Sequence, residues 1–320
     1  MPLAAALRSM AESNAGGAPL EVVILTSAFS PAMRTKVESS LPPKSISIRW
    51  VEIDLHSFQT FSTRSYISKI TFARLLLSSY LSDQVKKVLY LDGDLLVLGN
   101  LQEAWELDLG GAPVAAVMDT ESIDHCSRLD SLLELQNAQF SASNNRTLGE
   151  YFNAGVLLID MARWREEQVS EKALRFMADN PDTPLADQDA LNVACAAKWK
   201  KLDARWNCQT HDPRGYSAVA PEQRPAIVHF AGKWKPWSAT TLSPDSGFYN
   251  DFRKRTKFAR TPVQRALYSV IHGFTLLRSY VRQFKTLHAT YRFLKMQALN
   301  RMAVMSRKRA LRYGNDINCK

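Results

Sequence analysis

Residues 87–97, KVLYLDGDLLV, decide the fold that we expect for this chain. The apolar run at residues 88–91 predicts a buried strand, and Asp92, Gly93 and Asp94 follow at its carboxyl end, where ligands bind in open α/β folds. Positions i and i+2 of an extended chain point the same way, so both carboxylates can reach one cation. Carboxylate oxygens suit Mg²⁺ or Mn²⁺, and a cation with two protein ligands keeps positions open for a diphosphate. A plain acidic turn after a strand is the alternative.

Strands and helices alternate along the rest of the chain. We expect strands at residues 21–26, 46–53, 87–92, 114–119, 151–160 and 226–230, and helices at residues 3–13, 31–41, 66–81, 161–180 and 187–197. This alternation indicates an α/β fold with a mostly parallel sheet that is covered on both faces. An alternating unit normally opens with a strand, whereas this pattern opens with a helix. We therefore expect that the first strand is missing from this reading frame.

The composition excludes a disulfide framework and a membrane span. The chain has 320 residues, 46% of them hydrophobic, which is enough for a substantial core. The four cysteines form no CxxC pair and no zinc-ligand spacing, which indicates isolated thiols in a reducing compartment. No run approaches the roughly 18 apolar residues of a membrane span, and residues 1–7 make a poor signal peptide. We expect a cytoplasmic protein.

The positive charge is concentrated at the C-terminal end. Residues 253–320 contain 17 Lys and Arg residues against one acidic residue, whereas residues 1–252 contain 24 basic and 30 acidic residues. We expect an α/β domain at 1–252 and a basic helical tail at 253–320. In the tail, apolar residues recur at helical spacing from Val263 to Leu294 with cations beside them, which is typical of a helix on an anionic membrane surface. A helix packed on the α/β domain is the alternative; nucleic acid is not expected, because no nucleic-acid-binding motif is present.

Three further segments carry polar side chains near predicted strand ends and helix starts. Arg74 in TFAR suits phosphate or sugar oxygens, and Asn153 in YFNAGV offers a donor and an acceptor beside Gly155, which allows close backbone approach. Asp187 and Asp189 in ADQDALN precede a helix, and we expect one of them to cap it. Each segment alone also has an ordinary structural explanation as a solvated arginine, a turn or a helix cap.

The segment HFAGKWKPW, residues 229–237, is more specific. His229 follows a predicted strand, Gly232 permits a tight turn, and Lys235 can neutralise a phosphate. A neutral imidazole is a suitable third ligand for Mn²⁺. A lone histidine is more often structural, so the signal lies in the combination and order of these residues.

Taken together, the motifs resemble glycosyltransferase family 8, the retaining, nucleotide-sugar-dependent enzymes that include bacterial lipopolysaccharide glucosyl- and galactosyltransferases and glycogenin. The resemblance runs from residue 3 to residue 237 and rests on TFAR, KVLYLDGDLLV, YFNAGVLLID, ADQDALN and HFAGKWKPW in the family's order. It implies a GT-A type fold, a nucleotide-binding α/β sheet. The family begins with a strand and a loop that grip uracil, and this chain starts at the helix that follows, so the resemblance does not extend to the nucleobase contacts.

The resemblance also implies roles for individual residues. The metal ligands would be Asp92, Asp94 and His229, and the donor diphosphate would be held by Gly232 and Lys235. The reacting anomeric carbon would lie beside Asp187 and Gln188. The remaining donor-binding positions would be Arg74, Gly93, Asp119, Asn153 and Ala154.

The implied reaction moves a hexose, glucose or galactose, from a UDP-sugar to a saccharide acceptor with an α-linkage. A lipopolysaccharide core at the inner face of the membrane is the acceptor that fits best. Mn²⁺, or Mg²⁺, and Lys235 would neutralise the leaving diphosphate, which needs no general acid. Retention through an adduct on Asp187 is one route. We favour the other, front-face attack within a short-lived ion pair.

Two rival interpretations are less consistent with the sequence. Haloacid-dehalogenase-type phosphatases also carry a strand followed by DxD, but their motif lies near the start of the domain, and a small or β-branched residue commonly follows it, where this chain has Leu95. An inactive, membrane-peripheral, transferase-like scaffold would fit the missing strand. Such a dead site has no physical need for the acidic pair, His229 and Lys235.

Overall fold

The computed structural model describes residues 2–27, 29–63, 68–140, 149–196, 198–209, 224–240, 246–283 and 296. The chain divides into two compact units, the first formed by residues 1–238 and 243–261 and the second by residues 239–242 and 262–320. Helix α9 (Ser246–Lys254) crosses residue 252, where the charge distribution predicted the boundary, and the first unit continues to Thr261. All the predicted site residues belong to the first unit.

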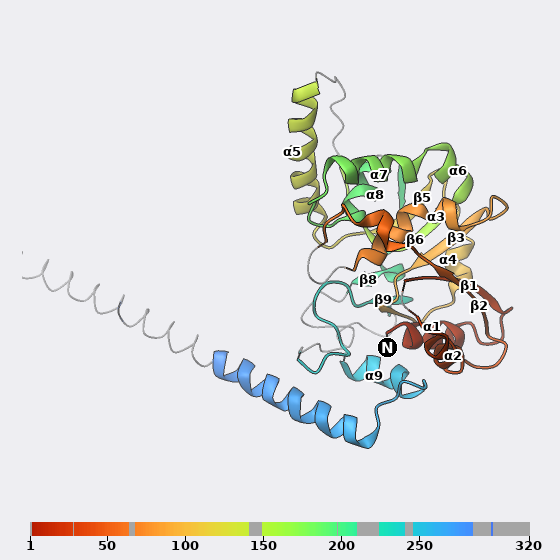
Figure 1. Cartoon of the computed structure of the whole chain (residues 1–320), viewed down its shortest axis with the longest axis vertical. Helices are drawn as coiled ribbons and strands as arrows, with labels where there is room; N and C mark the ends of the chain where they lie inside the picture. The colour runs from red at the N-terminus through yellow and green to blue at the C-terminus, as the bar shows by residue number, and fades with distance from the viewer. Residues whose placement is uncertain are drawn as a thin grey trace, which may run out of the picture. The chain divides into compact units, whose positions relative to one another are not determined.

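Helices and strands alternate through the first unit, as predicted (Figure 1). Its strands are β1 (Leu20–Thr26), β2 (Ile46–Glu52), β3 (Lys87–Leu91), β4 (Leu95–Val97), β5 (Val114–Met118), β6 (Phe152–Asp160), β7 (Trp199–Lys201), β8 (Cys208–Gln209) and β9 (Ile227–His229). Its α-helices, besides α9, are α1 (Pro2–Ser13), α2 (Pro31–Glu38), α3 (Leu77–Tyr80), α4 (Leu101–Trp105), α5 (Ser122–Phe140), α6 (Met161–Glu166), α7 (Val169–Asp179) and α8 (Asp187–Ala194). Three 3₁₀ helices, η1 (Leu55–Phe58), η2 (Lys69–Leu76) and η3 (Ala204–Trp206), are also described in the first unit.

The described strands form three sheets, with the orders β1-β2, β3-β6-β5-β7 and β4-β9-β8. Three of the six pairings are parallel, β1 with β2, β5 with β7 and β8 with β9, and the other three are antiparallel. The predicted α/β class is confirmed, but the prediction that the sheet is mostly parallel is wrong. Strand β6 runs antiparallel to both of its neighbours. Its continuous apolar run is typical of a parallel strand buried on both faces, and here an antiparallel strand has that burial.

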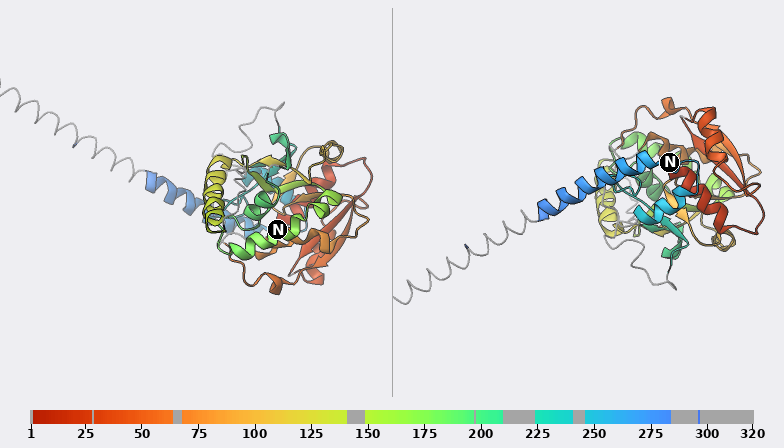
Figure 2. Two further views of the ribbon diagram at one scale, coloured as in Figure 1. Left: turned by 90° about the horizontal axis from the view of Figure 1, so that it is seen from above. Right: turned by 90° about the horizontal axis from the view of Figure 1, so that it is seen from below.

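Both faces of β6 are covered, as expected. Leu157 and Ile159 belong to one core cluster, which α7, α8 and η2 complete, whereas Val156 and Leu158 belong to a second cluster with α1 and α4. This division follows the two-residue period of a strand. Figure 2 shows the helices on both sides of the strands.

Strand register brings the carboxyl ends of β3 and β9 together. The last residue of β3, Leu91, pairs with Val156 of β6, and the chain then crosses from β3 to β4 through residues 92–94. The first residue of β4, Leu95, pairs with His229 at the end of β9. Asp92 and Asp94 therefore lie on the segment that joins β3 to β4, and His229 lies at the end of β9, opposite the first residue of β4.

Two predicted helices differ from the structure. The described part of the 66–81 segment is the 3₁₀ helix η2 followed by the short α3. Four consecutive residues of η2 are buried, so the segment has no solvent-facing side of the kind that an amphipathic α-helix needs. The predicted helix at 161–180 is two helices, α6 and α7, because Gln168 between them adopts a left-handed conformation with φ of 52°. Helices α4, α5 and α9 were not predicted.

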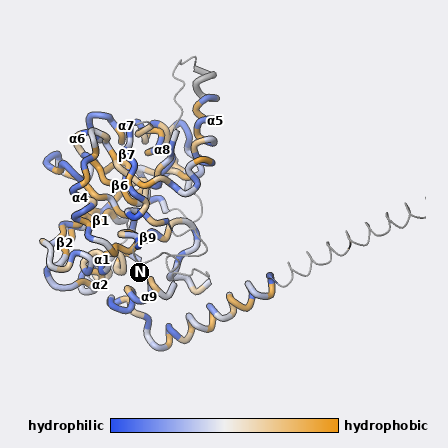
Figure 3. The backbone as a smooth tube through the Cα atoms, turned by 180° about the vertical axis from the view of Figure 1, so that it is seen from behind, coloured by the Kyte–Doolittle hydropathy of each residue, from blue (hydrophilic) through white to orange (hydrophobic). Residues whose placement is uncertain are grey.

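The described part of the second unit contains one long helix at residues 262–283. It coincides with the first two thirds of the predicted tail helix, and the rest of that prediction lies outside the described residues. Hydrophobic and hydrophilic residues are interleaved along it (Figure 3). Within the described residues, no helix is both long enough and apolar enough to cross a bilayer.

Candidate active site

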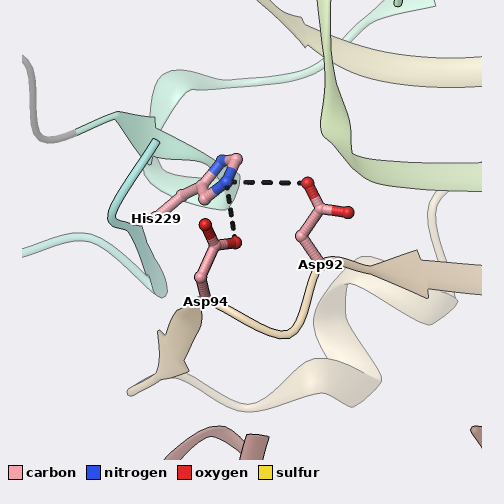
Figure 4. Close-up of side chains that lie close together, drawn as sticks. All are labelled: Asp92, Asp94 and His229. Atoms are coloured by element: carbon pink, nitrogen blue, oxygen red, sulfur yellow. Dashed lines mark ion pairs between the residues drawn. The ribbon is translucent and has the colours of Figure 1, made fainter. Parts of the chain in front are cut away.

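Asp92, Asp94 and His229 converge on one point. Each offers a ligand atom, and these atoms lie within 4.8 Å of one another. Nε2 of His229 is 3.4 Å from Oδ1 of Asp94 and 3.7 Å from Oδ2 of Asp92 (Figure 4). The sequence prediction that these residues come together is confirmed, although they belong to β9 and to the crossing between β3 and β4.

The donor set fits a hard or borderline divalent cation. Two carboxylates and an imidazole suit Mn²⁺ or Mg²⁺ better than a thiophilic metal, and no cysteine joins the cluster. Among the described residues, this is also the one group of three or more acidic, histidine or cysteine side chains with such spacing. Cys126, Cys195 and Cys208 take no part in it.

The two carboxylates have different surroundings. Oδ1 of Asp92 accepts hydrogen bonds from the Tyr90 hydroxyl at 2.8 Å and from Nη2 of Arg74 at 2.9 Å. Burial nevertheless raises the pKa of Asp92 above its ordinary value, and Arg74 opposes that shift. Burial would also raise the pKa of Asp94, but His229 and Lys235 outweigh it and hold the pKa well below its ordinary value.

Lys235 lies directly against the acidic pair. Its Nζ is 2.5 Å from Oδ2 of Asp94 and donates a second hydrogen bond of 2.7 Å to the carbonyl of Phe230. An anchored ammonium beside an acidic pair is well placed to contact an anion bound there.

Arg74 joins the acidic pair to Asp187. It is buried, and its Nε is 2.7 Å from Oδ2 of Asp187, while its Nη1 donates a 2.5 Å hydrogen bond to the carbonyl of Ala154. Burial opposes the charge on Arg74, yet Asp187 and Asp92 raise its pKa above the usual value. Oδ2 of Asp187 is itself buried and receives no aligned hydrogen bond from the described residues. The alternative explanation of Arg74 as a solvated helix arginine is therefore wrong.

Asp119, Asn153 and Gln188 form a second polar group. Oδ2 of Asp119 accepts hydrogen bonds from Nδ2 of Asn153 at 3.0 Å and from Nε2 of Gln188 at 3.3 Å. Oε1 of Gln188 accepts from the backbone N–H of Ala154 at 3.0 Å. Burial would raise the pKa of Asp119, but hydrogen bonds from His125, Asn153 and the Glu121 backbone lower it to about 2.

Gly93 and Gly232 are the two glycines that the sequence placed near the donor. A side chain added at Gly93 would meet nothing within 4 Å. Gly232 has φ of 72°, a conformation that favours glycine, and it forms the turn between His229 and Lys235. Gly93 lies between Asp92 and Asp94, Gly232 lies three residues from both His229 and Lys235, and their predicted contacts with the donor stay predictions.

The prediction that Asp187 or Asp189 caps α8 is wrong. The N-cap is Ala186, at φ of 50°, and Asp187 and Asp189 lie in the first turn. Asp189 is fully buried and accepts hydrogen bonds from Tyr151 at 2.7 Å, Thr183 at 2.6 Å, Arg128 at 2.6 Å and the Leu185 N–H at 3.0 Å. It holds α8 in place, and with it the neighbouring Asp187 and Gln188.

Sequence reasoning did not identify Tyr90 or Asn207, which contact the metal-binding group. Tyr90 bonds to Asp92, and Asn207 bonds to His229 through Oδ1 and Nδ1, which are 3.0 Å apart. Tyr90 carries a weak signal, because it lies two residues before Asp92 on a strand and so faces the same side. Asn207 carries none, because it follows a short 3₁₀ helix and no motif surrounds it.

Known proteins resemble this chain along most of its length. The family described as "Glycosyl transferase family 8" matches residues 1–241. The general stress protein A of Bacillus subtilis is 28% identical over 255 residues, which make up 75% of this chain and 84% of that protein. The lipopolysaccharide 1,3-galactosyltransferase of Salmonella typhimurium is 26% identical over 204 residues, 62% of this chain and 58% of that protein.

A solved structure shares the fold. The galactosyltransferase LgtC, in complex with donor and acceptor sugar analogs, superimposes with a TM-score of 0.65 over 82% of this chain and 93% of that chain. At 24% identity the likeness speaks for the fold alone, and it confirms the predicted GT-A type. A haloacid-dehalogenase-type phosphatase is accordingly not favoured.

Proposed function

The chain belongs to glycosyltransferase family 8, and we propose that it transfers glucose or galactose from a UDP-sugar to a saccharide acceptor, with retention and hence an α-linkage. The observation that carries this proposal is the convergence of Asp92, Asp94 and His229 beside Lys235. A divalent cation at the three ligands, Mn²⁺ or Mg²⁺, would neutralise charge that develops on the departing diphosphate.

The two basic residues of the site, Lys235 and Arg74, would have different roles. Lys235, held by Asp94 and the Phe230 carbonyl, would contact the diphosphate directly. Arg74 is buried and already paired with two carboxylates, so its role would be to fix the positions of Asp92 and Asp187 relative to each other. Because a nucleoside diphosphate leaves without protonation, the site needs no acid with a raised pKa at the scissile bond.

The group around Asp119 would bind the hexose. Asp119, Asn153 and Gln188 already orient one another, which keeps their polar groups preorganised for sugar hydroxyls. No donor from the described part of the chain is aligned with the buried Oδ2 of Asp187, and a sugar hydroxyl would supply one. Gly93, Gly232 and Ala154 would contribute backbone close to the donor.

Retention would proceed by front-face attack rather than through an adduct on Asp187. The nearby Arg74 guanidinium neutralises the Asp187 carboxylate, which makes it a weaker nucleophile. Incubation with donor, followed by intact-protein and peptide mass spectrometry, is expected to find no hexose on Asp187. A glycosylated Asp187 peptide that forms and decays at the rate of turnover would overturn this route.

The acceptor and the cellular site follow from the relatives and from the tail. The relative from Salmonella typhimurium is named a lipopolysaccharide galactosyltransferase, which supports a lipopolysaccharide core or another lipid-linked saccharide as acceptor. Helix 262–283 carries Arg265, Arg278 and Arg282 and no acidic residue, and its exposed apolar side chains include Phe274. This combination supports docking on the cytoplasmic, anionic face of a membrane.

Thermal shift tests the donor site directly. The purified chain is expected to gain stability with UDP and Mn²⁺ together, and Asp94→Asn, which replaces a charged ligand with a neutral amide of the same shape, is expected to lose that gain. Equal shifts in both proteins would defeat the metal assignment. Release of UDP from UDP-glucose or UDP-galactose by wild type, but not by Asp94→Asn, separates an active transferase from an inactive scaffold.

A further inference from the structure

A continuous chain of buried, hydrogen-bonded side chains runs from Asp119, in the proposed sugar-binding group, through two asparagine amides to the metal-binding His229. Asp119, Asn153, Asn207 and His229 are 6%, 5%, 1% and 3% exposed. Asn153 donates to Asp119 at 3.0 Å, Asn207 donates to Oδ1 of Asn153 at 2.9 Å, and Oδ1 of Asn207 is 3.0 Å from Nδ1 of His229. Asn207 is the link between the two groups.

The orientation of every member of this chain follows from one backbone group. The N–H of Gly155 can only donate, and it lies 3.0 Å from Oδ1 of Asn153, so that atom is an oxygen and accepts. The amide of Asn153 then faces the Asp119 carboxylate. Because Asn207 donates its own amide to the same oxygen of Asn153, its carbonyl oxygen must face His229. That oxygen can only accept, so Nδ1 of His229 carries a proton.

This protonation decides which nitrogen can bind a cation. In a neutral imidazole with a proton on Nδ1, the lone pair is on Nε2. Nε2 is the nitrogen that faces Asp92 and Asp94. Residues that hold the second ring nitrogen of a metal-binding histidine fix its tautomer and its ring orientation.

We propose that Asn207 is a positioning residue that fixes His229 with Nε2 toward the cation and couples it to the hexose-binding pair Asn153 and Asp119. The proposal rests on the proposed function. The fold supports it: Asn207 lies between the buried Trp206 and β8, and β8 pairs in parallel with β9, so that Gln209 is opposite His229. Asn207 is thereby held beside the histidine by a sheet register rather than by a flexible loop.

Two substitutions separate the two contacts of Asn207. Asn207→Ala removes both. Asn207→Asp keeps an oxygen that accepts from Nδ1 of His229 but replaces the amide that donates to Asn153. Asn192→Ala is the matched control, because Asn192 is an equally buried amide whose side chain bonds to the backbone of Phe152 and Gln188.

The first readout is the affinity for Mn²⁺ without any nucleotide, from the electron paramagnetic resonance signal of the free ion. Asn207→Ala is expected to weaken binding about 10-fold or more, the usual loss on removing such a partner. Asn207→Asp and Asn192→Ala are expected to stay near wild type. Binding by Asn207→Ala equal to that of Asn192→Ala overturns the proposal. Wild type that binds no Mn²⁺ overturns the proposed function instead.

The second readout is long-range ¹H–¹⁵N NMR of the histidine rings in the metal-free full chain, with His229 assigned from a His229→Asn variant. A proton on Nδ1 of His229 is expected, and a bare Nδ1 overturns the proposal. Steady-state kinetics test the coupling between His229 and the hexose-binding pair. Asn207→Asp is expected to raise KM for the donor several-fold with little change in kcat. An unchanged KM would show that the contact of Asn207 with Asn153 does not affect donor binding, which contradicts the proposed coupling. The NMR and Asn207→Asp measurements still decide the matter if Asn207→Ala does not fold.

Discussion

Gly155 lies so close to His229 that it has no room for a side chain. A β-carbon at Gly155 would be 2.7 Å from Nδ1 of His229, closer than real β-carbons come, and 3.0 Å from Oδ2 of Asp92, which is tighter than most real contacts. The backbone of β6 thus forms one wall of the metal-binding group. The N–H of Gly155 orients Asn153, and its carbonyl accepts from the N–H of Asp92 at 2.8 Å.

Gly155→Ala is therefore expected to abolish Mn²⁺ binding. The added methyl must displace the buried imidazole or the partly exposed Asp92 carboxylate, and either shift separates two of the three ligands. Titration of Mn²⁺ against the purified variant measures the effect. Gly93→Ala is the control, because its methyl meets no atom within 4 Å and should leave binding within a few-fold of wild type. Wild-type affinity in Gly155→Ala would show that His229 is not held where the structure has it.

Arg74→Met is expected to lower the free energy of unfolding by about 3 kcal/mol, the usual cost of removing one partner of a buried ion pair. The substitution keeps the apolar stem and leaves Asp92 and Asp187 without their shared cation. Urea unfolding gives the value. Combining Arg74→Met with Asp187→Asn should recover part of the loss, because one uncompensated charge is then removed. Strictly additive losses would mean that Arg74 and Asp187 do not interact.

Asp119 should make stability depend on pH in the acid range. Its pKa is lowered from 3.8 to about 2 in the folded chain, so the charged form stabilises the fold. That contribution, about 2 kcal/mol, is complete above pH ~4 and disappears as the pH falls toward ~2. The difference in unfolding free energy between wild type and Asp119→Asn should shrink over this interval in urea titrations. A difference that is constant from pH 5 to pH 3 would contradict the shift.

The full chain should sediment with vesicles that contain phosphatidylglycerol and much less with pure phosphatidylcholine. Six exposed apolar residues follow one another at helical spacing along residues 262–283: Val263, Leu267, Val270, Phe274, Leu277 and Val281. Phe274→Glu puts a charge in the middle of this stripe and should abolish binding. Ser269→Glu adds the same charge away from the stripe and should weaken it only modestly. Equal effects of the two variants would indicate simple charge attraction without insertion of the apolar stripe.

Local sequence predicted most elements because each depends on neighbours in the chain. The apolar runs at β3 and β6 favoured strands, and Pro31 at the start of α2 favoured a helix that begins there. The same reasoning failed at Gln168, whose left-handed conformation no propensity indicates, and at η2, where burial on all sides replaced the expected amphipathic helix. In both places tertiary packing overrode local preference.

No local sequence pattern could predict the direction of the strands or the residues that hold the site residues in place. A long apolar strand shows that both of its faces are buried, but not whether its partners run parallel to it, and β6 proved antiparallel to both. Asp189 resembled a helix cap and is instead a buried acceptor for four donors from three segments. Asn207 belongs to no motif that would have marked it as part of the site.

The sequence by itself determined the chemistry available: an acidic pair at a strand end, and a histidine with a lysine six residues later. Those residue types can bind a divalent cation and a phosphate wherever they meet, because ligand preference belongs to the side-chain atoms. Only the tertiary structure decided that they meet, since the register between β4 and β9 sets Leu95 opposite His229 across more than a hundred residues of chain. It also decided how each is oriented, because hydrogen bonds act over about 3 Å and their partners are chosen by packing.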